Sequence, residues 1–318
     1  MKVSVLSLNP GIDRVMYLPT PMNPGHMNRL THTVTSQGSK GANCAILLHR
    51  LGCRVEYFSF TGGIYGGVCN SFTDGEGISS VYVEAACGTR VNTKLIDGNG
   101  VCSEFNEPGG PFSEDEIKAL TDAFLSSDAD VYVMTGSLPS GADPFLYARL
   151  TSELKKKGAA VVLDCAGDAL KNALPSGPDL IKPNADELDR LCADLGVSPD
   201  GSIAEKAAAV IGKSRGGNGS PAGIRTMIVT DGGNGSYLFT DGIADFCPPS
   251  DVIAEGFSGA GDCFLCGFVY AKYSEGTDDR EAHLFASCCG GAKVTLGGTL
   301  IPSPDCIYRL FNLRKANL

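Results

Sequence analysis

The sequence predicts an α/β fold in which helices cover both faces of a mostly parallel central sheet. Short apolar runs of the kind that form buried strands alternate along the chain with stretches of helical periodicity. Parallel strands need crossover connections, usually helices, so this alternation is typical of βαβ units. The chain has 318 residues and 43% hydrophobic content, which is enough for one large core. We therefore expect a single domain that spans residues 1–318.

The predicted elements follow from local composition in chain order. Residues 1–8 form a first strand, because the apolar run is stopped at once by Asn9-Pro10-Gly11. The same stop argues against a signal peptide. Further strands are predicted at 131–135, 161–163, 180–181 and 227–230, helices at 42–50, 144–157 and 203–211, and a Gly-rich loop at 214–223.

Two stretches, 12–35 and 81–105, lie outside the βαβ rhythm and are predicted to be extended segments with turns between them. In the second stretch, the period-2 geometry of a strand places Arg90, Asn92 and Lys94 on one face. Two cations and an amide on a common face suit a phosphate or a polyol. The alternative is an ordinary solvated strand face, although a basic cluster is notable in a chain of net charge −10.

The composition limits the classes of partner. The negative net charge argues against a nucleic-acid partner. No apolar stretch reaches the roughly 18 residues of a membrane span, so no membrane partner is expected. The 13 cysteines are scattered through apolar runs, as is typical of buried, reduced thiols in a cytoplasmic protein. Cys263 and Cys266, and the pair Cys288-Cys289, are therefore expected to be core residues and not a zinc or redox site.

The most informative motif is Gly259-Ala260-Gly261-Asp262, which opens an apolar run with the character of a buried helix. Glycines let a ligand approach the backbone closely, and free N–H groups at a helix start bind anions. A carboxylate beside an anion site would repel the anion unless it takes a proton from the attacking group. The motif therefore suggests phosphoryl transfer to a hydroxyl with Asp262 as general base. The alternative is that Asp262 caps the helix.

Polar residues near two earlier turns are placed to bind a sugar. Gly38 and Asn43 belong to a second Gly-rich turn at a helix start, in which Lys40 can contact a phosphate. Asp13 follows the first strand, and ligands of open parallel sheets bind at the carboxyl ends of strands. A simple turn role is the alternative for Asp13.

Two later turns suggest a metal and a nucleotide. Asn184 and Glu187 are three residues apart at a helix start, which suits either a capping box or a magnesium site completed by waters. Residues 230–235 form a tight turn between two strands, which is either a plain hairpin or a surface under a nucleotide.

Together these motifs resemble those of the ribokinase-like sugar kinases, also called the phosphofructokinase B family, over essentially the whole chain. The matches to the family pattern are residues 38–43, the Asn184-x-x-Glu187 motif and residues 259–262. Within the family the chain looks most like the hexose-phosphate branch, 1-phosphofructokinase and tagatose-6-phosphate kinase. This narrower resemblance rests on residues 8–13, 89–94, 106–109 and 136–141.

The resemblance implies a ribokinase-like three-layer sandwich with a small β lid made from 12–35 and 81–105, through which the chain forms a homodimer. It implies ATP and Mg²⁺ as cofactors and a ketohexose phosphate as acceptor. Fructose 1-phosphate is the first choice of acceptor, and tagatose 6-phosphate is the alternative within the family. A non-catalytic sugar-phosphate or nucleotide sensor is the alternative from another class.

The resemblance also assigns roles by position. The catalytic set is Asp262 as base with Gly259, Ala260 and Gly261 as anion hole. The sugar-phosphate set is Asp13, Gly38, Ser39, Lys40, Asn43, Arg90, Asn92 and Lys94. The nucleotide set is Lys182, Asn184, Thr230, Gly232, Gly235 and Ser258, with Glu187 acting on Mg²⁺ through water.

Three departures from the family pattern concern the acceptor and the rate more than the fold. Ser39 stands where a second glycine is usual and adds a side chain near the expected sugar. Asp231 stands where the nucleotide turn usually carries a small or apolar residue. Residues 63–77 look shortened and Gly-rich where a longer helix is usual.

Overall fold

Two sheets of unequal size and the helices around them form the structure, a computed structural model that describes residues 1–198, 200–215 and 223–317. The large sheet contains β1 (Lys2–Ser7), β4 (Arg54–Thr61), β5 (Ser79–Glu84), β8 (Val131–Thr135), β9 (Ala160–Asp164), β10 (Leu180–Ile181), β11 (Thr226–Thr230), β12 (Ser236–Thr240) and β13 (Ile243–Cys247). The small sheet contains β2 (Gly11–Tyr17), β3 (His32–Gln37), β6 (Arg90–Ile96) and β7 (Cys102–Asn106).

The helices lie between these strands in the sequence. They are α1 (Lys40–Arg50), α2 (Gly63–Asp74), α3 (Glu114–Ser126), α4 (Leu146–Lys156), α5 (Gly167–Ala173), α6 (Ala185–Asp194), α7 (Ile203–Ser214), α8 (Ala260–Val269), α9 (Asp279–Val294) and α10 (Pro304–Lys315). Short non-α helical turns cover Leu174–Ser176, Gly232–Asn234 and Tyr270–Ser274. Most of the loop predicted at 214–223 lies outside the described residues.

The large sheet has the order β13-β12-β11-β10-β9-β8-β1-β4-β5 within the described ranges. Its strands from β11 to β5 pair in parallel, and β12 and β13 add an antiparallel edge. The mostly parallel sheet that the sequence predicts is therefore confirmed.

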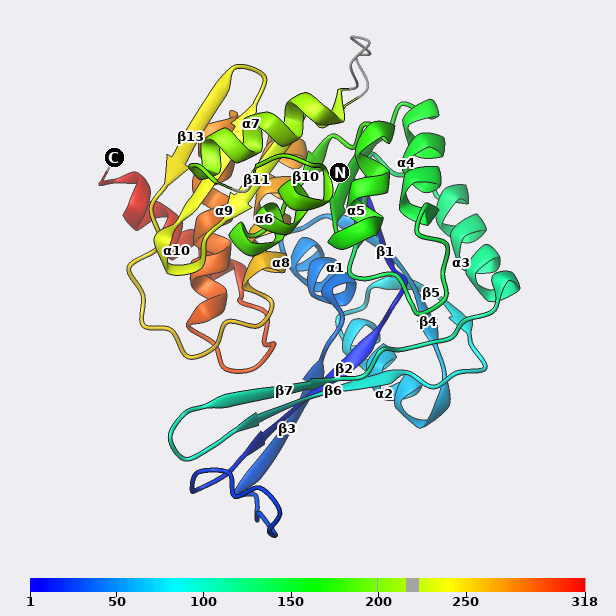
Figure 1. Cartoon of the computed structure of the whole chain (residues 1–318), viewed down its shortest axis with the longest axis vertical. Helices are drawn as coiled ribbons and strands as arrows, with labels where there is room; N and C mark the ends of the chain where they lie inside the picture. Colours follow the sequence, from blue (N-terminus) through cyan, green and yellow to red (C-terminus); the bar gives the residue numbers. More distant parts are fainter. Residues whose placement is uncertain (199, 216–222, 318) are drawn as a thin grey trace.

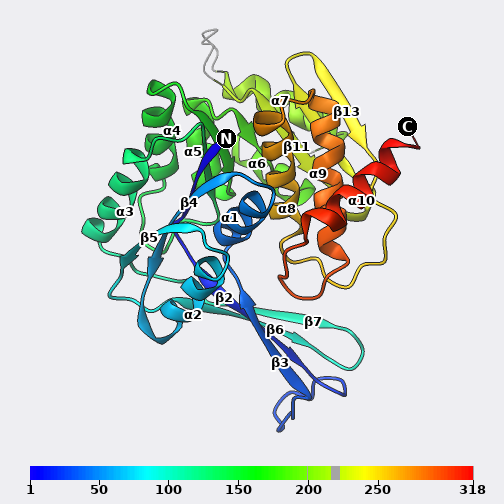
Figure 2. The ribbon, with the colours of Figure 1, turned by 180° about the vertical axis from the view of Figure 1, so that it is seen from behind.

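Helices cover both faces of this sheet, which gives three layers (Figures 1 and 2). Helices α3 to α7 pack on one face, and α1, α8, α9 and α10 pack on the other. Val5 and Leu6 are consecutive and fully buried, yet they enter different cores. Strand side chains alternate between the two faces of a sheet, so one buried strand supplies both cores.

The predicted strands and helices are present, with ends that shift by a few residues. One boundary is wrong. Residues 81–84, predicted to begin the second lid segment, belong to β5, which pairs in parallel with β4 in the large sheet. Its alternating polar and apolar residues occur equally in a half-exposed edge strand and in a lid strand, so the sequence pattern does not separate the two. The Gly-rich stretch from residue 63 forms α2 despite its glycines.

The small sheet, called the lid below, has the order β3-β2-β6-β7 and projects from the body of the molecule (Figure 1). Strand β2 pairs antiparallel with β3 and parallel with β6. The β2–β6 register sets Asp13 opposite Asn92, so both side chains lie on the same face.

All 13 cysteines are free, and most are buried, as predicted. Cys263, Cys266, Cys288 and Cys289 all pack in the core shared by α1, α8 and α9. In the described part of the chain, no cluster of His, Cys, Asp and Glu is placed to hold a metal ion. None of the described helices combines the length and the apolar character that crossing a membrane requires.

Candidate active site

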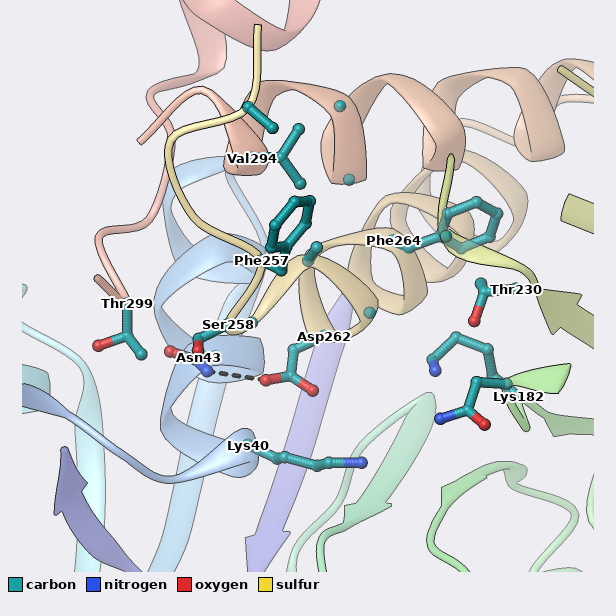
Figure 3. A pocket seen from close by; sticks show the side chains of 18 of the residues that line it. Lys40, Asn43, Lys182, Thr230, Phe257, Ser258, Asp262, Phe264, Val294 and Thr299 are labelled. Carbon is teal, nitrogen blue, oxygen red and sulfur yellow. Dashed lines mark hydrogen bonds between the residues drawn. The ribbon is translucent and has the colours of Figure 1, made fainter. Parts of the chain in front are cut away.

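The described residues enclose a cleft of about 860 Å³ that reaches from the lid to the carboxyl ends of the parallel strands. Figure 3 shows side chains from α1, α8 and the end of β10 pointing into it. The predicted site residues that line the cleft are Asp13, Gly38, Lys40, Asn43, Arg90, Asn92, Lys94, Lys182, Asn184, Glu187, Thr230, Gly232, Gly235, Ser258, Gly259, Ala260, Gly261 and Asp262. The structure thus brings together the predicted set, with the exception of Ser39.

Helix α8 begins with backbone groups that are free to meet a ligand. Gly259 is the N-cap with φ +83°, a left-handed conformation that favours glycine. The N–H of Ala260 bonds the Phe257 carbonyl at 3.2 Å, and the N–H of Cys263 bonds the Gly259 carbonyl at 3.0 Å. The predicted anion hole therefore loses the Ala260 amide. The N–H groups of Gly261 and Asp262 have no acceptor among the described residues.

Asp262 lies on the first turn of α8 with only 5% of its surface exposed. Its Oδ2 accepts a hydrogen bond from Asn43 Nδ2 at 2.7 Å (Figure 3). Because the cap is Gly259 and Asp262 makes no capping bond, the capping alternative is wrong. Burial raises the pKa of the Asp262 carboxyl, and the nearby Lys40 ammonium offsets part of this rise. A buried carboxylate at a ligand cleft is chemically suited to accept a proton.

The ammonium groups of Lys40 and Lys182 flank Asp262, and both pair with the buried carboxylate of Asp164. Asp164 Oδ2 lies 3.5 Å from Lys40 Nζ, and Asp164 Oδ1 lies 3.5 Å from Lys182 Nζ. Although burial opposes ionisation of Asp164, the two lysines lower its pKa. Asp164 and then Asp262 raise the pKa of Lys40. Both ammonium groups are thus held beside the start of α8, where they can neutralise a phosphoryl group.

Ser39 faces away from the cleft. It is the N-cap of α1, and its hydroxyl accepts a hydrogen bond from the Ala42 N–H. The same hydroxyl lies 2.7 Å from Ser7 Oγ, and the residue is 2% exposed. The side chain of Ser39, which is predicted to contact a sugar, therefore does not reach the cleft. Ser39, which stands where a second glycine is usual, holds the turn in place through its hydrogen bonds and does not form part of the cleft wall.

Gly38, in contrast, has no room for a side chain. A Cβ at this position would lie 2.5 Å from both the backbone N and Oδ1 of Asp13. The turn that precedes α1 can therefore approach the start of β2 only because residue 38 is glycine.

We expect Gly38→Ala to lower the free energy of unfolding by about 1–3 kcal/mol, because backbone atoms must move apart to relieve the overlap. Urea denaturation measures this loss. Gly67→Ala is the matched control, since a Cβ there meets nothing within 4 Å on an exposed helix face. Equal stability of the two variants would contradict the close approach at Gly38.

The predicted polar face of β6 is confirmed. Asp13 accepts hydrogen bonds from Asn92 Nδ2 at 3.1 Å and Lys94 Nζ at 3.0 Å. Arg90 Nη1 donates to the Glu107 carbonyl at 3.0 Å, but its buried Nε has no partner among the described residues. The buried Asn92 Oδ1 is likewise unpartnered there. Buried polar groups are usually satisfied, so this face of the lid is suited to a polar ligand.

Asn184 and Glu187 form the capping box that the sequence allows. The Glu187 N–H donates to Asn184 Oδ1 at 2.7 Å, and the Asn184 N–H donates to Glu187 Oε2 at 2.9 Å. Both residues also line the cleft, so capping and a role in the cleft are compatible.

The turn at 230–235 is a hairpin, because β11 and β12 pair antiparallel across it. Asp231 accepts a hydrogen bond from Asn234 Nδ2 at 3.1 Å within the turn and does not line the cleft. Ser258 accepts a hydrogen bond from Lys94 and so connects the lid to the segment that enters α8.

The sequence alone missed Asp164 and Thr299. Asp164 ends β9 within an apolar run, and its position at a strand end is the signal that could have identified it. Thr299 lines the cleft and donates to the Gln37 carbonyl at 2.5 Å. No local pattern relates Thr299 to a turn 262 residues earlier.

The comparisons with known proteins cover nearly the whole chain. The sequence model described as "pfkB family carbohydrate kinase" matches residues 6–306. The chain is 28% identical to a 1-phosphofructokinase of Bacillus subtilis over 268 residues, which cover 84% of each protein. It is 27% identical to a 1-phosphofructokinase of Borreliella burgdorferi over 321 residues, which cover 99% of each.

Solved structures agree with this fold. Phosphofructokinase-2 of Escherichia coli in complex with substrates and products matches with a TM-score of 0.88 and 25% identity, covering 98% of this chain and 99% of that one. Ribokinase of Thermotoga maritima matches with a TM-score of 0.76 and 21% identity, covering 98% and 99%. The ribokinase-like fold predicted from the sequence is confirmed.

Proposed function

The chain belongs to the pfkB family of carbohydrate kinases, and on this premise we propose that it phosphorylates fructose 1-phosphate to fructose 1,6-bisphosphate. As a family member it is a sugar kinase, a phosphotransferase with an alcohol group as acceptor. Relatives named 1-phosphofructokinase, at 27–28% identity, support a sugar phosphate as the acceptor class. ATP is the proposed phosphoryl donor.

The observation that carries this proposal is a cleft with an anion-binding group at each of two sites. One site is the start of α8, with two free N–H groups and the lysines held by Asp164. The other is the lid face, with Arg90 and Lys94. The α8 site suits the phosphoryl group in transfer, and the lid site suits the phosphate that the acceptor already carries. An unphosphorylated sugar would leave the second site without a use.

The transfer follows from the same geometry. The acceptor hydroxyl attacks the γ-phosphorus, the bond between that phosphorus and the β–γ bridging oxygen breaks, and ADP leaves. Asp262 takes the proton of the hydroxyl, and Asn43 orients its carboxylate through the 2.7 Å hydrogen bond. The N–H groups of Gly261 and Asp262 stabilise the charge on the phosphoryl oxygens.

Residues of the cleft also fit a magnesium ion bound mainly by phosphates. Glu187 offers one carboxylate at the cleft, and Asp164 is already paired with two lysines. Mg²⁺ keeps several waters and commonly takes only one or two protein carboxylates. Glu187 would hold the ion through water, and the ion would neutralise charge on the nucleotide phosphates.

The lid is proposed to form a two-fold dimer. The turns that join its strands, and β7, expose Met27, Leu30, Val101 and Phe105. Small sheets of this kind are marginally stable in water unless their apolar side chains are covered. A second lid packed on the first would cover them symmetrically.

We expect light scattering at micromolar concentration to give a dimer, with and without sugar phosphate. Phe105→Glu and Leu30→Glu together place charges on the exposed apolar surface and should convert the dimer to a monomer. Leu313→Glu is the control, because Leu313 is exposed on α10 away from the lid. A strict monomer of the unaltered protein would contradict the lid dimer.

A panel of sugar phosphates with ATP and Mg²⁺, followed by detection of ADP and of the bisphosphate, tests the function directly. We expect the highest kcat/KM with fructose 1-phosphate. A higher value with tagatose 6-phosphate or fructose 6-phosphate would replace the proposed acceptor. Nucleotide and sugar-phosphate binding without transfer to any acceptor would instead identify a sensor.

A further inference from the structure

Lys293 is a buried cation that the transfer described above does not use. It lies in the last turn of α9, and its side chain has no exposed surface. Within the described ranges of the chain, no carboxylate lies within ion-pair distance of its ammonium group. Burial of a charge without an opposite charge is unfavourable, so such lysines are rare in proteins unless other groups compensate them.

Backbone carbonyl groups supply the compensation. Lys293 Nζ donates hydrogen bonds to the Gly298 carbonyl at 3.0 Å and to the Leu296 carbonyl at 3.3 Å. Both residues belong to the segment that leaves α9. The last turn of a helix carries partial negative charge, so the position of Lys293 in α9 also favours a cation. A helix cap is therefore one explanation of a lysine at this position.

A helix cap does not account for every contact of Lys293, because the residue lies directly behind the start of α8. A Cβ built on Gly259 would lie 3.6 Å from Lys293 Cε. The segment that enters α8 is fixed to the end of α9, since the N–H groups of Glu255 and Gly256 donate to the Val294 carbonyl at 2.7 and 3.2 Å. The lysine thus lies between the segment that leaves α9 and the glycine that opens the anion site.

The segment held by Lys293 also reaches the sugar side of the cleft. It continues to Thr299, which lines the cleft, donates to the Gln37 carbonyl at 2.5 Å and lies 2.7 Å from Ser36 Oγ. Gly38, whose backbone touches Asp13, follows directly. One buried charge therefore supports both the phosphoryl side and the sugar side of the site.

We propose that Lys293 is a built-in monovalent cation of the active site. Its ammonium gathers the Leu296 and Gly298 carbonyl groups and adds positive charge behind Gly259, which fixes the N–H groups that meet the transferred phosphoryl group. Lys293 is a positioning residue, since it acts through the backbone and does not line the cleft. The inference deepens the proposed function and rests on it.

Removal of the ammonium should leave a carbonyl-lined cavity that accepts a small cation from solution. We expect kcat of Lys293→Ala to fall about tenfold in tetramethylammonium chloride, which is less than the loss of a direct oxyanion donor. Methylammonium, ammonium or potassium ions at about 100 mM should restore most of the loss. Lys293→Met fills the cavity without charge, so it should be slow and remain slow in every salt.

Two comparisons separate this role from a helix cap. The unaltered protein should show the same kcat in all of these salts, and so should Lys272→Ala, a lysine of the same helical hairpin paired with Asp279 at 2.8 Å. Thermal unfolding of each protein reports stability separately. If Lys293→Met loses stability but keeps kcat, or if the unaltered protein itself depends on potassium, the inference is overturned.

Binding of a non-hydrolysable ATP analogue, measured by calorimetry, distinguishes this inference from the proposed function. We expect the analogue to bind Lys293→Met about tenfold more weakly than the unaltered protein. An unaltered protein that is inactive on all sugar phosphates would overturn the proposed function alone. Equal analogue affinity and equal kcat of the two proteins would overturn the role of Lys293 alone.

Discussion

Asp262→Asn is expected to lower kcat by about 10²–10⁴-fold, the usual contribution of a general base. The amide keeps the size of the side chain and can still accept the hydrogen bond from Asn43, but it cannot take the proton of the acceptor hydroxyl. The KM values should change little, because the substitution leaves the anion-binding groups in place. Steady-state kinetics with sugar phosphate and ATP measures both parameters.

The thermal stability of Asp262→Asn, unlike its kcat, should not decrease. Burial raises the pKa of the Asp262 carboxyl above 3.8, so the folded state binds its proton more tightly than the unfolded state does. The folded protein therefore loses stability as the pH rises from 3.8 through the raised pKa, and the ionised carboxylate is a net cost at neutral pH. The neutral asparagine avoids this cost, so its melting temperature at pH 7 should equal or exceed that of the unaltered protein.

The pH profile gives a third readout and a control. Turnover of the unaltered protein should fall as the pH falls through the raised pKa, whereas the residual turnover of the variant should lack this acid limb. Asp186→Asn is the matched control, because Asp186 is an exposed carboxylate on the first turn of α6 and does not line the cleft. Near-normal turnover of Asp262→Asn would contradict the general base.

Arg90→Ala is expected to raise the KM for the sugar phosphate about ten- to a hundredfold, since a charge-assisted contact contributes about 1.5–3 kcal/mol. The side chain is confined between two glycines: a Cβ on Gly11 would lie 2.9 Å from Arg90 Cγ, and one on Gly109 would lie 3.1 Å from Arg90 Cδ. Its buried Nε has no protein partner among the described residues and can donate to a phosphate. The KM for ATP should barely change.

Arg14→Ala is the matched control for this experiment. Arg14 is exposed on β2 of the same sheet, and strand alternation sets it on the face opposite Asp13. It should leave both KM values unchanged. An equal rise in the KM for both substrates after Arg90→Ala, or activity confined to unphosphorylated sugars, would contradict a phosphate site at the lid.

Local geometry explains which site residues the sequence could predict. The common face of Arg90, Asn92 and Lys94 follows from the strand period, and the structure confirms it through Asp13. The free N–H groups at the start of α8 follow from a Gly-rich turn before an apolar helix. In both cases the information lies within a few residues of chain, where backbone stereochemistry restricts the arrangement.

The predictions that differ from the structure depend on contacts between distant parts of the chain. Ser39 is predicted to contact a sugar, but its hydroxyl bonds Ser7 and turns away from the cleft. Residues 81–84 are predicted to belong to the lid, although they pair with β4. Each of these outcomes depends on which of two surfaces a side chain or a strand joins, and that choice is made by packing against distant parts of the chain.

The sequence by itself determined the α/β class, the alternation of strands and helices, and the residue types that line the start of α8 and the lid face. Only the tertiary structure decided that Asp164 holds Lys40 and Lys182, that Asn43 orients Asp262 across 219 residues of chain, and that Lys293 lies behind Gly259. The physical reason is the range of the interactions. Backbone sterics and side-chain periodicity act between neighbours in the chain, whereas burial and ion pairing act between neighbours in space, which the fold alone establishes.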